Sequence, residues 1–421
     1  MTSSYLPLSA EERVAMLPSE HAAKTMSKHE PSWVESFHYI LFDSWFNLTL
    51  VFVPLTFLSH TLEWDITFRF LFSFMAIVPL AKLLGEATDQ LSMKVGQTIS
   101  GLLNASFGNA VETIVGITAL LKGEFLIVQS SMLGSVLSDI LLVLGCSFVA
   151  GGMYRKEARF NAEGARASAS LMTFSCISLA IPAVYASSAM TGSQMSPCTD
   201  PEDQCPTSGL LIISRGISGL LFLVYCACVL FQLKTHHHYY RQEDNDEDEG
   251  EDVRMSPSAA CFALFLITAI TAFCADYLVA SIEETAKKYN VPKTFIGLIL
   301  LPTASNATEH ATAILMAIKN KYQLAIEICV GSAIQITNLV IPLLVILGWI
   351  VGQPLTIRFA NFETITLFVS VLLLHLLIMN GKSTYLEGTM MIMLYLAIAM
   401  ACECHEIYGM EYNVLTSLSL E

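Results

Sequence analysis

The sequence predicts an all-α polytopic membrane protein. Of its 421 residues, 54% are hydrophobic and only 14% are charged, and the mean hydropathy is +0.57. Apolar runs of about 20 residues, the length with which a helix spans a bilayer, recur along almost the whole chain. Together these observations indicate a bundle of helices embedded in lipid.

Eleven transmembrane helices account for the apolar runs. Acidic residues precede the first run, so we predict no cleaved signal peptide and interpret residues 1–35 as a polar tail. Lys and Arg are more frequent in the connections on the N-terminal side, which predicts a cytoplasmic N-terminus and, with an odd number of helices, a lumenal C-terminus. The predicted helices cover residues 43–62, 66–88, 98–121, 126–150, 166–188, 209–232, 258–281, 294–318, 323–351, 361–380 and 386–402.

The formal charge of −15 is concentrated in one stretch. The run EDNDEDEGED at 243–252 supplies eight of these negative charges, and the remainder is ordinary for this length. We therefore predict no nucleic-acid partner. The run is either a solvated cytoplasmic linker or a cation-collecting, regulatory helix that uses Asp244, Asp246, Glu247 and Asp248.

Most of the eleven Cys lie inside apolar segments, where they serve as small buried residues. The exceptions are Cys198 and Cys205, which share a polar loop on the lumenal side of the predicted topology. A disulfide between them stays open as an alternative, since such bonds form where the compartment is oxidising.

Two short motifs place ionisable groups in the middle of apolar runs. NASFGNAVE at 104–112 carries Asn109 and Glu112, and LPTASNATEH at 301–310 carries Asn306 and Glu309. An ionisable group at the centre of a membrane helix costs about 2.5–3.5 kcal/mol on insertion scales. Because the chain has two such groups, we infer that both Asn–Glu pairs have a function.

The two motifs belong to an internal repeat. A shift of 197 residues superposes both Asn and both Glu, and it also aligns Gly134 with Gly331, Ser135 with Ser332 and Glu86 with Glu283. The repeat contains five helices, an odd number, so the two halves have opposite orientation. The predicted organisation is a cytoplasmic tail at 1–35, an extra first helix at 36–63, the first repeat at 64–232, an acidic cytoplasmic linker at 233–257, the second repeat at 258–405 and a C-terminal tail at 406–421.

Inverted repeats are typical of secondary transporters, in which interrupted helices form a site near the bilayer midplane. Pro302 predicts such an interruption in the second repeat. Two carboxylates surrounded by neutral oxygen donors suit a hard divalent cation, because Ca²⁺ takes about 6–8 oxygen ligands. The predicted cation ligands are Glu112, Glu309, Asn109, Asn306, Ser135, Ser332 and Gln335.

Protons are expected to compete with the cation for the same two carboxylates, because burial favours the protonated form and a bound cation displaces it. His310 follows Glu309 and serves either as a structural hydrogen-bonding group or in proton handling. Four acids nearer helix ends are either structural or line the path by which ions enter: Glu86, Asp89, Asp276 and Glu283.

The motifs resemble those of a known family. GNAVE at 108–112, NATEH at 306–310, QSSMLGSVLSDILLVLG at 129–145, FCADYLV at 273–279 and the acidic linker resemble the vacuolar cation/proton exchangers, in particular the fungal-type Ca²⁺/H⁺ exchangers of the Ca²⁺/cation antiporter superfamily. The resemblance extends over about residues 36–405. It implies exchange of cytosolic Ca²⁺ for protons of an acidic, vacuole-like lumen, with Glu112 and Glu309 as the central ion-binding carboxylates. It implies no cofactor and no enzymatic activity.

Alternatives concern the transported ions and the reaction. Mn²⁺ is a second candidate substrate, and a Na⁺-driven Ca²⁺ exchanger of the same superfamily is the alternative function. The Na⁺-driven branch typically has Thr-Ser-hydrophobic-Pro ahead of its acid, where this chain has GNAV and SNAT. An intramembrane metalloprotease built on His310 would need a second zinc-binding His nearby, and the sequence has none there.

The chain departs from the family pattern at two positions. Ser305 replaces the Gly that usually begins the second motif, which restricts the backbone and adds a hydroxyl beside the site. We therefore expect this position to affect cation selectivity. Asp89 is followed by Gln90 where relatives often have two adjacent acids, so the cytoplasmic entrance is expected to be less negative.

Overall fold

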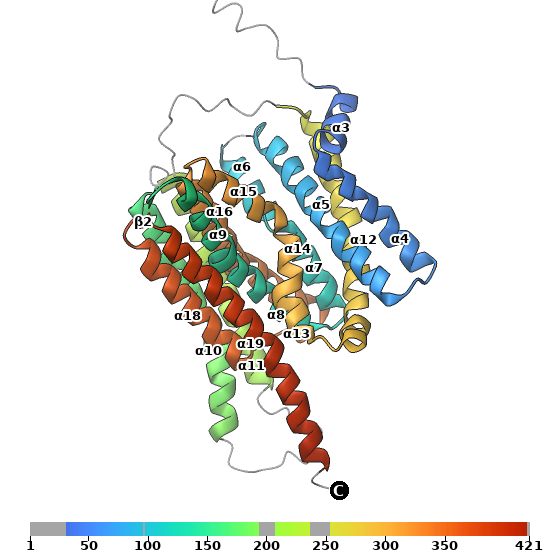
Figure 1. Ribbon diagram of the computed structural model, residues 1–421, viewed down its shortest axis with the longest axis vertical. Helices are drawn as coiled ribbons and strands as arrows, with labels where there is room; N and C mark the ends of the chain where they lie inside the picture. Colours follow the sequence, from blue (N-terminus) through green and yellow to red (C-terminus); the bar gives the residue numbers. More distant parts are fainter. Residues whose placement is uncertain (1–30, 96, 193–206, 236–252, 419–421) are drawn as a thin grey trace, which may run out of the picture.

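The computed structural model describes residues 31–95, 97–192, 207–235 and 253–418, and over these residues it is almost entirely helical (Figure 1). Eight described helices are long and apolar enough to cross a membrane, or nine if one sharply bent pair is counted as a single span. The only described strands are β1 (Ala158–Arg159) and β2 (Lys382–Ser383), which pair antiparallel. The loop cysteines and the acids of the 243–252 run lie outside the described residues.

The first predicted span is bent. It comprises α3 (Trp33–Phe42), the 3₁₀ helix η1 (Trp45–Val51) and α4 (Phe52–Thr61), with a bend of 86°. Ser44 has an extended backbone, and its hydroxyl accepts the Phe46 N–H, so the chain stops one helix and starts another here. The prediction of one helix over 43–62 preceded by a tail to residue 35 was therefore wrong at its start.

The long helices α5 (Ile66–Ser92) and α12 (Pro257–Tyr289) pack against each other along their length. Lys288 near the end of α12 pairs with Asp65 at the start of α5, at 2.6 Å. At the opposite end, the Gln90 side chain accepts the backbone N–H of Arg254 at 2.8 Å. The two helices are therefore antiparallel.

The third and eighth predicted spans are each broken in the middle. The first is divided into α6 (Gln97–Phe107) and α7 (Ala110–Leu121). The second break falls at Asn306, and its parts are α13 (Lys293–Phe295), the π-helical turn η5 (Ile296–Leu300), α14 (Leu301–Ser305) and α15 (Ala307–Ile318).

Pro302 does not cause the second break, contrary to the prediction from sequence. It lies in the first turn of α14, where the missing N–H of proline costs little, and the helix continues to Ser305. The two breaks, at Asn109 and at Asn306, are 197 residues apart.

Two helices of about 30 residues occupy the centre, and each contains a π-helical turn. The first consists of α8 (Phe125–Leu137), η2 (Ser138–Val143) and α9 (Leu144–Tyr154). The second consists of α16 (Tyr322–Gln335), η6 (Ile336–Val340) and α17 (Ile341–Val351). In the first, 83% of the residues of its most apolar stretch are buried inside the protein, whereas the corresponding share for the span at 208–235 is 17%. The helices α8 and α9 therefore form the core of the bundle.

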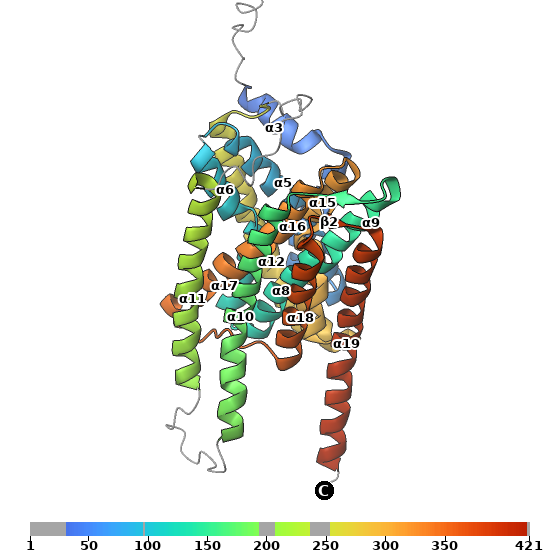
Figure 2. The same cartoon turned by 90° about the vertical axis from the view of Figure 1, so that its left-hand side faces the viewer.

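The remaining helices form the periphery. α10 lies beside α18, α11 packs on α17, and α19 lies beside α9. The far end of α19 is at the opposite end of the molecule from α3 (Figures 1 and 2). These outer elements are α10 (Ala162–Gly192), α11 (Thr207–Leu230) with its π-helical turn η3 (Phe231–Thr235), α18 (Asn361–Ile378) and α19 (Tyr385–Leu418).

Candidate functional site

The first helix break contacts a central helix of the other half of the chain. Asn109, only 2% exposed, lies between α6 and α7. Its side-chain N–H donates to Gln335 Oε1 at 2.9 Å, and its Oδ1 accepts the hydroxyl of Ser332 at 3.0 Å. Three predicted ligands from distant parts of the sequence are thus in direct contact.

The second break makes the reciprocal contact. Asn306, 1% exposed, donates its side-chain N–H to Asp139 Oδ1 in η2 at 3.0 Å. The hydroxyl of Ser305 donates to Asn306 Oδ1 at 3.1 Å. Each Asn at a break is therefore held by the central helix of the opposite half.

Both predicted carboxylates lie in the first turn of a helix that starts at a break. Glu112 is in α7 and is 5% exposed, and Glu309 is in α15 and is half-buried. The partial positive charge of a helix N-terminus favours a carboxylate at this place. Meanwhile α6 and α14 end at the breaks, and the last carbonyls of a helix lack intrahelical partners. Each break therefore combines a carboxylate with carbonyl oxygens that are available to a cation.

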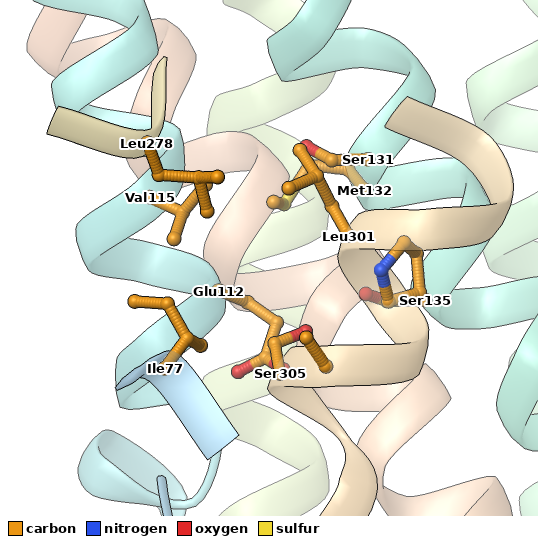
Figure 3. A pocket seen from close by; sticks show the side chains of 11 residues that line it. Ile77, Glu112, Val115, Ser131, Met132, Ser135, Leu278, Leu301 and Ser305 are labelled. Atoms are coloured by element: carbon orange, nitrogen blue, oxygen red, sulfur yellow. The ribbon is translucent and has the colours of Figure 1, made fainter. Parts of the chain in front are cut away.

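Within the described part of the chain, neither carboxylate has a positively charged partner. Glu112 and Glu309 form no ion pair among the residues that the structure describes. The Glu309 Oε2 atom is buried and has no hydrogen-bond partner there. The Glu112 carboxylate lies beside the hydroxyl of Ser305, with which it interacts (Figure 3). A buried acid without a counter-ion needs either a proton or a cation.

A narrow cavity adjoins Glu112. Its volume is about 10 Å³, which is close to the minimum that holds one water-sized sphere. An ion that keeps its full hydration shell is too large for a space of this size. Polar and apolar side chains both line it (Figure 3). The polar residues are Glu112, Ser131, Ser135 and Ser305, and the apolar ones include Val115, Met132 and Leu301.

His310 does not line this cavity. Its Nε2 is 3.2 Å from the hydroxyl of Ser138 in η2. The imidazole is half-buried and contacts the central helix rather than lining the cavity. This contact is compatible with both roles that the sequence left open for His310.

Asp139 was not among the predicted ligands. It is 1% exposed, its Oδ1 accepts the Asn306 N–H, and its Oδ2 is buried with no hydrogen-bond partner among the described residues. An acid inside the apolar run 126–150 was signal enough to find it, by the same reasoning that identified Glu112 and Glu309. The repeat comparison missed it because a shift of 197 pairs it with Ile336.

The four acids that we placed on the access path lie apart from these contacts. Three are paired with lysines and are partly exposed: Glu86 with Lys82 at 3.0 Å, Asp276 with Lys122 at 2.9 Å, and Glu283 with Lys287 at 2.9 Å and Lys293 at 3.9 Å. Asp89 is exposed near the end of α5. These ion pairs involve neither Glu112 nor Glu309.

The described residues hold no cluster of three or more His, Cys, Asp or Glu arranged as a preformed metal site. A bound cation would therefore need neutral oxygens as well as carboxylates. Those oxygens exist around the breaks, in the Asn and Ser side chains and the helix-terminal carbonyls. This donor set suits a hard cation that is bound transiently.

Comparison with protein families matches most of the chain to one of them. The model described as sodium/calcium exchanger protein matches residues 66–234 and 259–402. The chain is 41% identical to the "Vacuolar calcium ion transporter" of Schizosaccharomyces pombe over 362 residues, which cover 86% of this chain and 85% of that protein. It is 36% identical to the "Vacuolar cation/proton exchanger 2" of Oryza sativa subsp. japonica, with 95% and 92% covered.

Solved structures show the same similarity. The crystal structure of the selenium-substituted "Ca2+/H+ antiporter" protein YfkE superposes with a TM-score of 0.69 at 32% identity, covering 85% of this chain and 98% of that one. The crystal structure titled "H+/Ca2+ Exchanger CAX" has a TM-score of 0.62 at 13% identity, with 93% and 100% covered, and shows a shared fold.

Proposed function

The chain belongs to the sodium/calcium exchanger protein family, and we propose that it is an antiporter that moves Ca²⁺ into an acidic, vacuole-like compartment in exchange for protons. Its relatives are named vacuolar calcium or cation/proton transporters, and the similar YfkE structure is titled a Ca²⁺/H⁺ antiporter. The protein is accordingly a multi-pass transporter of an organellar membrane. The observation that carries the proposal is a pair of membrane-embedded acids, each at a helix break and neither with a counter-ion among the described residues.

Our topology has eleven crossings arranged as two inverted five-helix repeats after an extra first helix. Nine crossings come from the unbroken spans with the bent pair counted once, and the broken helices α6–α7 and α13–α15 add two. The antiparallel α5 and α12 and the 197-residue spacing of the breaks support the inversion. The N-terminus is then cytoplasmic and the C-terminus lumenal, in agreement with the opposite positions of α3 and the end of α19 (Figure 2).

The proposed cation site lies between the two breaks. Glu112 and Glu309 provide the charge, and neutral oxygens complete the coordination together with the carbonyls at the ends of α6 and α14. Ca²⁺ is the proposed substrate and Mn²⁺ a second one. The neutral ligands that we assign are Asn109, Asn306, Ser135, Ser332 and Gln335.

Exchange follows from the cost of burying unpaired charge. With both carboxylates ionised and no cation bound, the buried site carries an uncompensated charge, which is strongly disfavoured. One Ca²⁺ neutralises both carboxylates, and so do protons. The conformational change that carries the site across the membrane is therefore favourable only when it holds Ca²⁺ or protons, so the two fluxes are coupled.

Alternating access is supported by the unequal surroundings of α6 and α14. Asn104 lies in α6 and Gly108 directly follows it, and both are exposed. Their counterparts 197 residues later lie in α14, where Leu301 is only 4% exposed and Ser305 is half-buried. In our orientation this conformation is open towards the cytoplasm and closed towards the lumen. In the opposite conformation, α14 would be exposed and α6 would be buried.

The remaining sequence assignments stay proposals. His310 orders η2 through Ser138 or relays protons, and the lysine-paired acids Glu86, Asp276 and Glu283, with Asp89, influence how ions reach the site. Acids of the 243–252 run would collect Ca²⁺ or regulate transport from the cytoplasmic side.

Uptake of labelled Ca²⁺ into sealed vesicles that contain the purified protein tests the function. Acid inside the vesicles should accelerate uptake, and collapsing the pH gradient with a protonophore should remove the acceleration. Vesicles loaded with Na⁺ at equal pH on both sides are the matched comparison. Uptake that depends on internal Na⁺ and ignores the pH gradient would refute proton exchange and favour the Na⁺-driven alternative.

A further inference from the structure

We propose that Asp139 is a third carboxylate ligand of the transported cation, contributed by the first half of the chain alone. The inference rests on the proposed function, because it extends the cation site between Asn109 and Asn306. It assigns a role to a buried acid that the two-carboxylate site does not use.

The position of Asp139 points to a ligand. It lies in the π-helical turn η2, and such turns shift side chains relative to a regular helix and occur frequently at functional sites. Its Oδ1 accepts the side-chain N–H of Asn306, which sits at the second helix break. Asp139 is therefore held directly against the backbone interruption that we assign to the cation.

The second oxygen of Asp139 has no hydrogen-bond partner in the part of the chain that the structure describes. Oδ2 is buried without a hydrogen bond among the described residues, and the same is true of Glu309 Oε2. Asp139 is also close enough to Glu112 and Glu309 for the three carboxylates to repel one another. Leaving two carboxylate oxygens buried and unsatisfied costs several kcal/mol. A divalent cation between them would reduce the repulsion and coordinate both unsatisfied oxygens.

The third acid makes the site asymmetric. The position equivalent to Asp139 in the second half is Ile336, which is fully buried and is flanked by the neutral polar residues Gln335 and Thr337. The first half thus supplies Glu112 and Asp139, and the second supplies Glu309. Three carboxylates attract a divalent cation more strongly, relative to a monovalent one, than two do.

A purely structural role for Asp139 would be to accept the hydrogen bond from Asn306. The substitution Asp139→Asn separates the two roles, because the amide oxygen still accepts that hydrogen bond while the charge is lost. Ca²⁺ binding to the purified protein at neutral pH should weaken by at least about tenfold. The control Asp43→Asn makes the same chemical change at an exposed ion pair with Arg254, far from the breaks, and should alter the dissociation constant by less than about twofold.

Unchanged Ca²⁺ affinity in Asp139→Asn, with pH-driven uptake intact in the parent protein, would overturn the ligand role and leave the antiporter function standing. Absence of pH-driven uptake by the parent protein would instead refute the function itself. If Asp139→Asn does not accumulate, Asp139→Glu replaces it. A carboxylate moved by one methylene should change the relative affinity for Ca²⁺ and Mn²⁺ if it ligates, and an unaltered ratio would refute ligation.

Discussion

The two broken helices contain nearly the same motif but have different surroundings. α6 packs chiefly on α5, and Asn104 within it is exposed. α14, its counterpart at an offset of 197 residues, packs against α5, α7 and α8, and Leu301 within it is 4% exposed. The sequence is repeated, but the packing is not.

The glycines of the central helices show the same inequality. A Cβ atom at Gly134 would clash with the backbone oxygen of Leu298, so α8 and η5 approach each other as closely as glycine allows. Among the described residues, a Cβ atom at the equivalent Gly331 would meet nothing within 4 Å. Within the described part of the chain, backbone contact therefore closes one side of the site and not the other. Two halves with similar sequences can adopt either packing, which is what an exchanger with two conformations requires.

The largest expected effect follows from the feature that both halves share. Glu112→Gln and Glu309→Gln should each reduce pH-driven Ca²⁺ uptake by at least about 100-fold, because removing one charge from a buried site costs about 2–5 kcal/mol. The protein should still insert and remain monodisperse in detergent. Near-normal uptake by either variant would show that the two halves do not contribute equally to the site.

The glycine pair provides the second test. Gly134→Ala should lower the stability of the purified protein by about 1–3 kcal/mol, since the added methyl group meets backbone that cannot move aside. Gly331→Ala, the matched substitution in the other half, should change it by less than about 0.5 kcal/mol. Thermal unfolding measured in the same detergent compares them. Equal losses would contradict the unequal packing of α8 and α16.

Labelling from the water phase tests which side is open. In vesicles of known orientation, a membrane-impermeant maleimide should modify Asn104→Cys at least about tenfold faster than Leu301→Cys. Mass spectrometry of the labelled peptides distinguishes these positions from the native cysteines. Faster labelling of Leu301→Cys would mean that the second half is the open one.

The smallest effect concerns Ser305, the position at which the motifs differ. Its backbone is helical in this structure, a conformation that both Ser and Gly adopt. The hydroxyl is the relevant difference, since it bonds Asn306 and lies beside Glu112. Ser305→Gly should preserve proton-coupled transport and change the preference between Ca²⁺ and Mn²⁺ by about threefold, the value of one hydrogen bond. Competition of Mn²⁺ against labelled Ca²⁺ measures this, and identical competition curves would limit Ser305 to packing.

Composition and local pattern were sufficient for much of this protein. The length of the apolar runs predicted a polytopic membrane protein, and the cost of burying Glu112 and Glu309 identified the acids at the two breaks. The offset of 197 predicted that equivalent residues would lie at equivalent places in the helices. These properties are readable because hydropathy and the cost of a buried charge depend on each residue and its near neighbours in the chain.

Tertiary structure decided the rest. The 86° bend after α3, the continuation of α14 through Pro302 and the π-helical turn that positions Asp139 were not predicted from the sequence, because each depends on what packs against the helix. The contacts of Asn109 with Gln335 and of Asn306 with Asp139 join residues more than 160 positions apart. Local pattern has no information about such pairs. It also cannot specify which half is closed, because that is a property of the conformation and not of the repeated sequence.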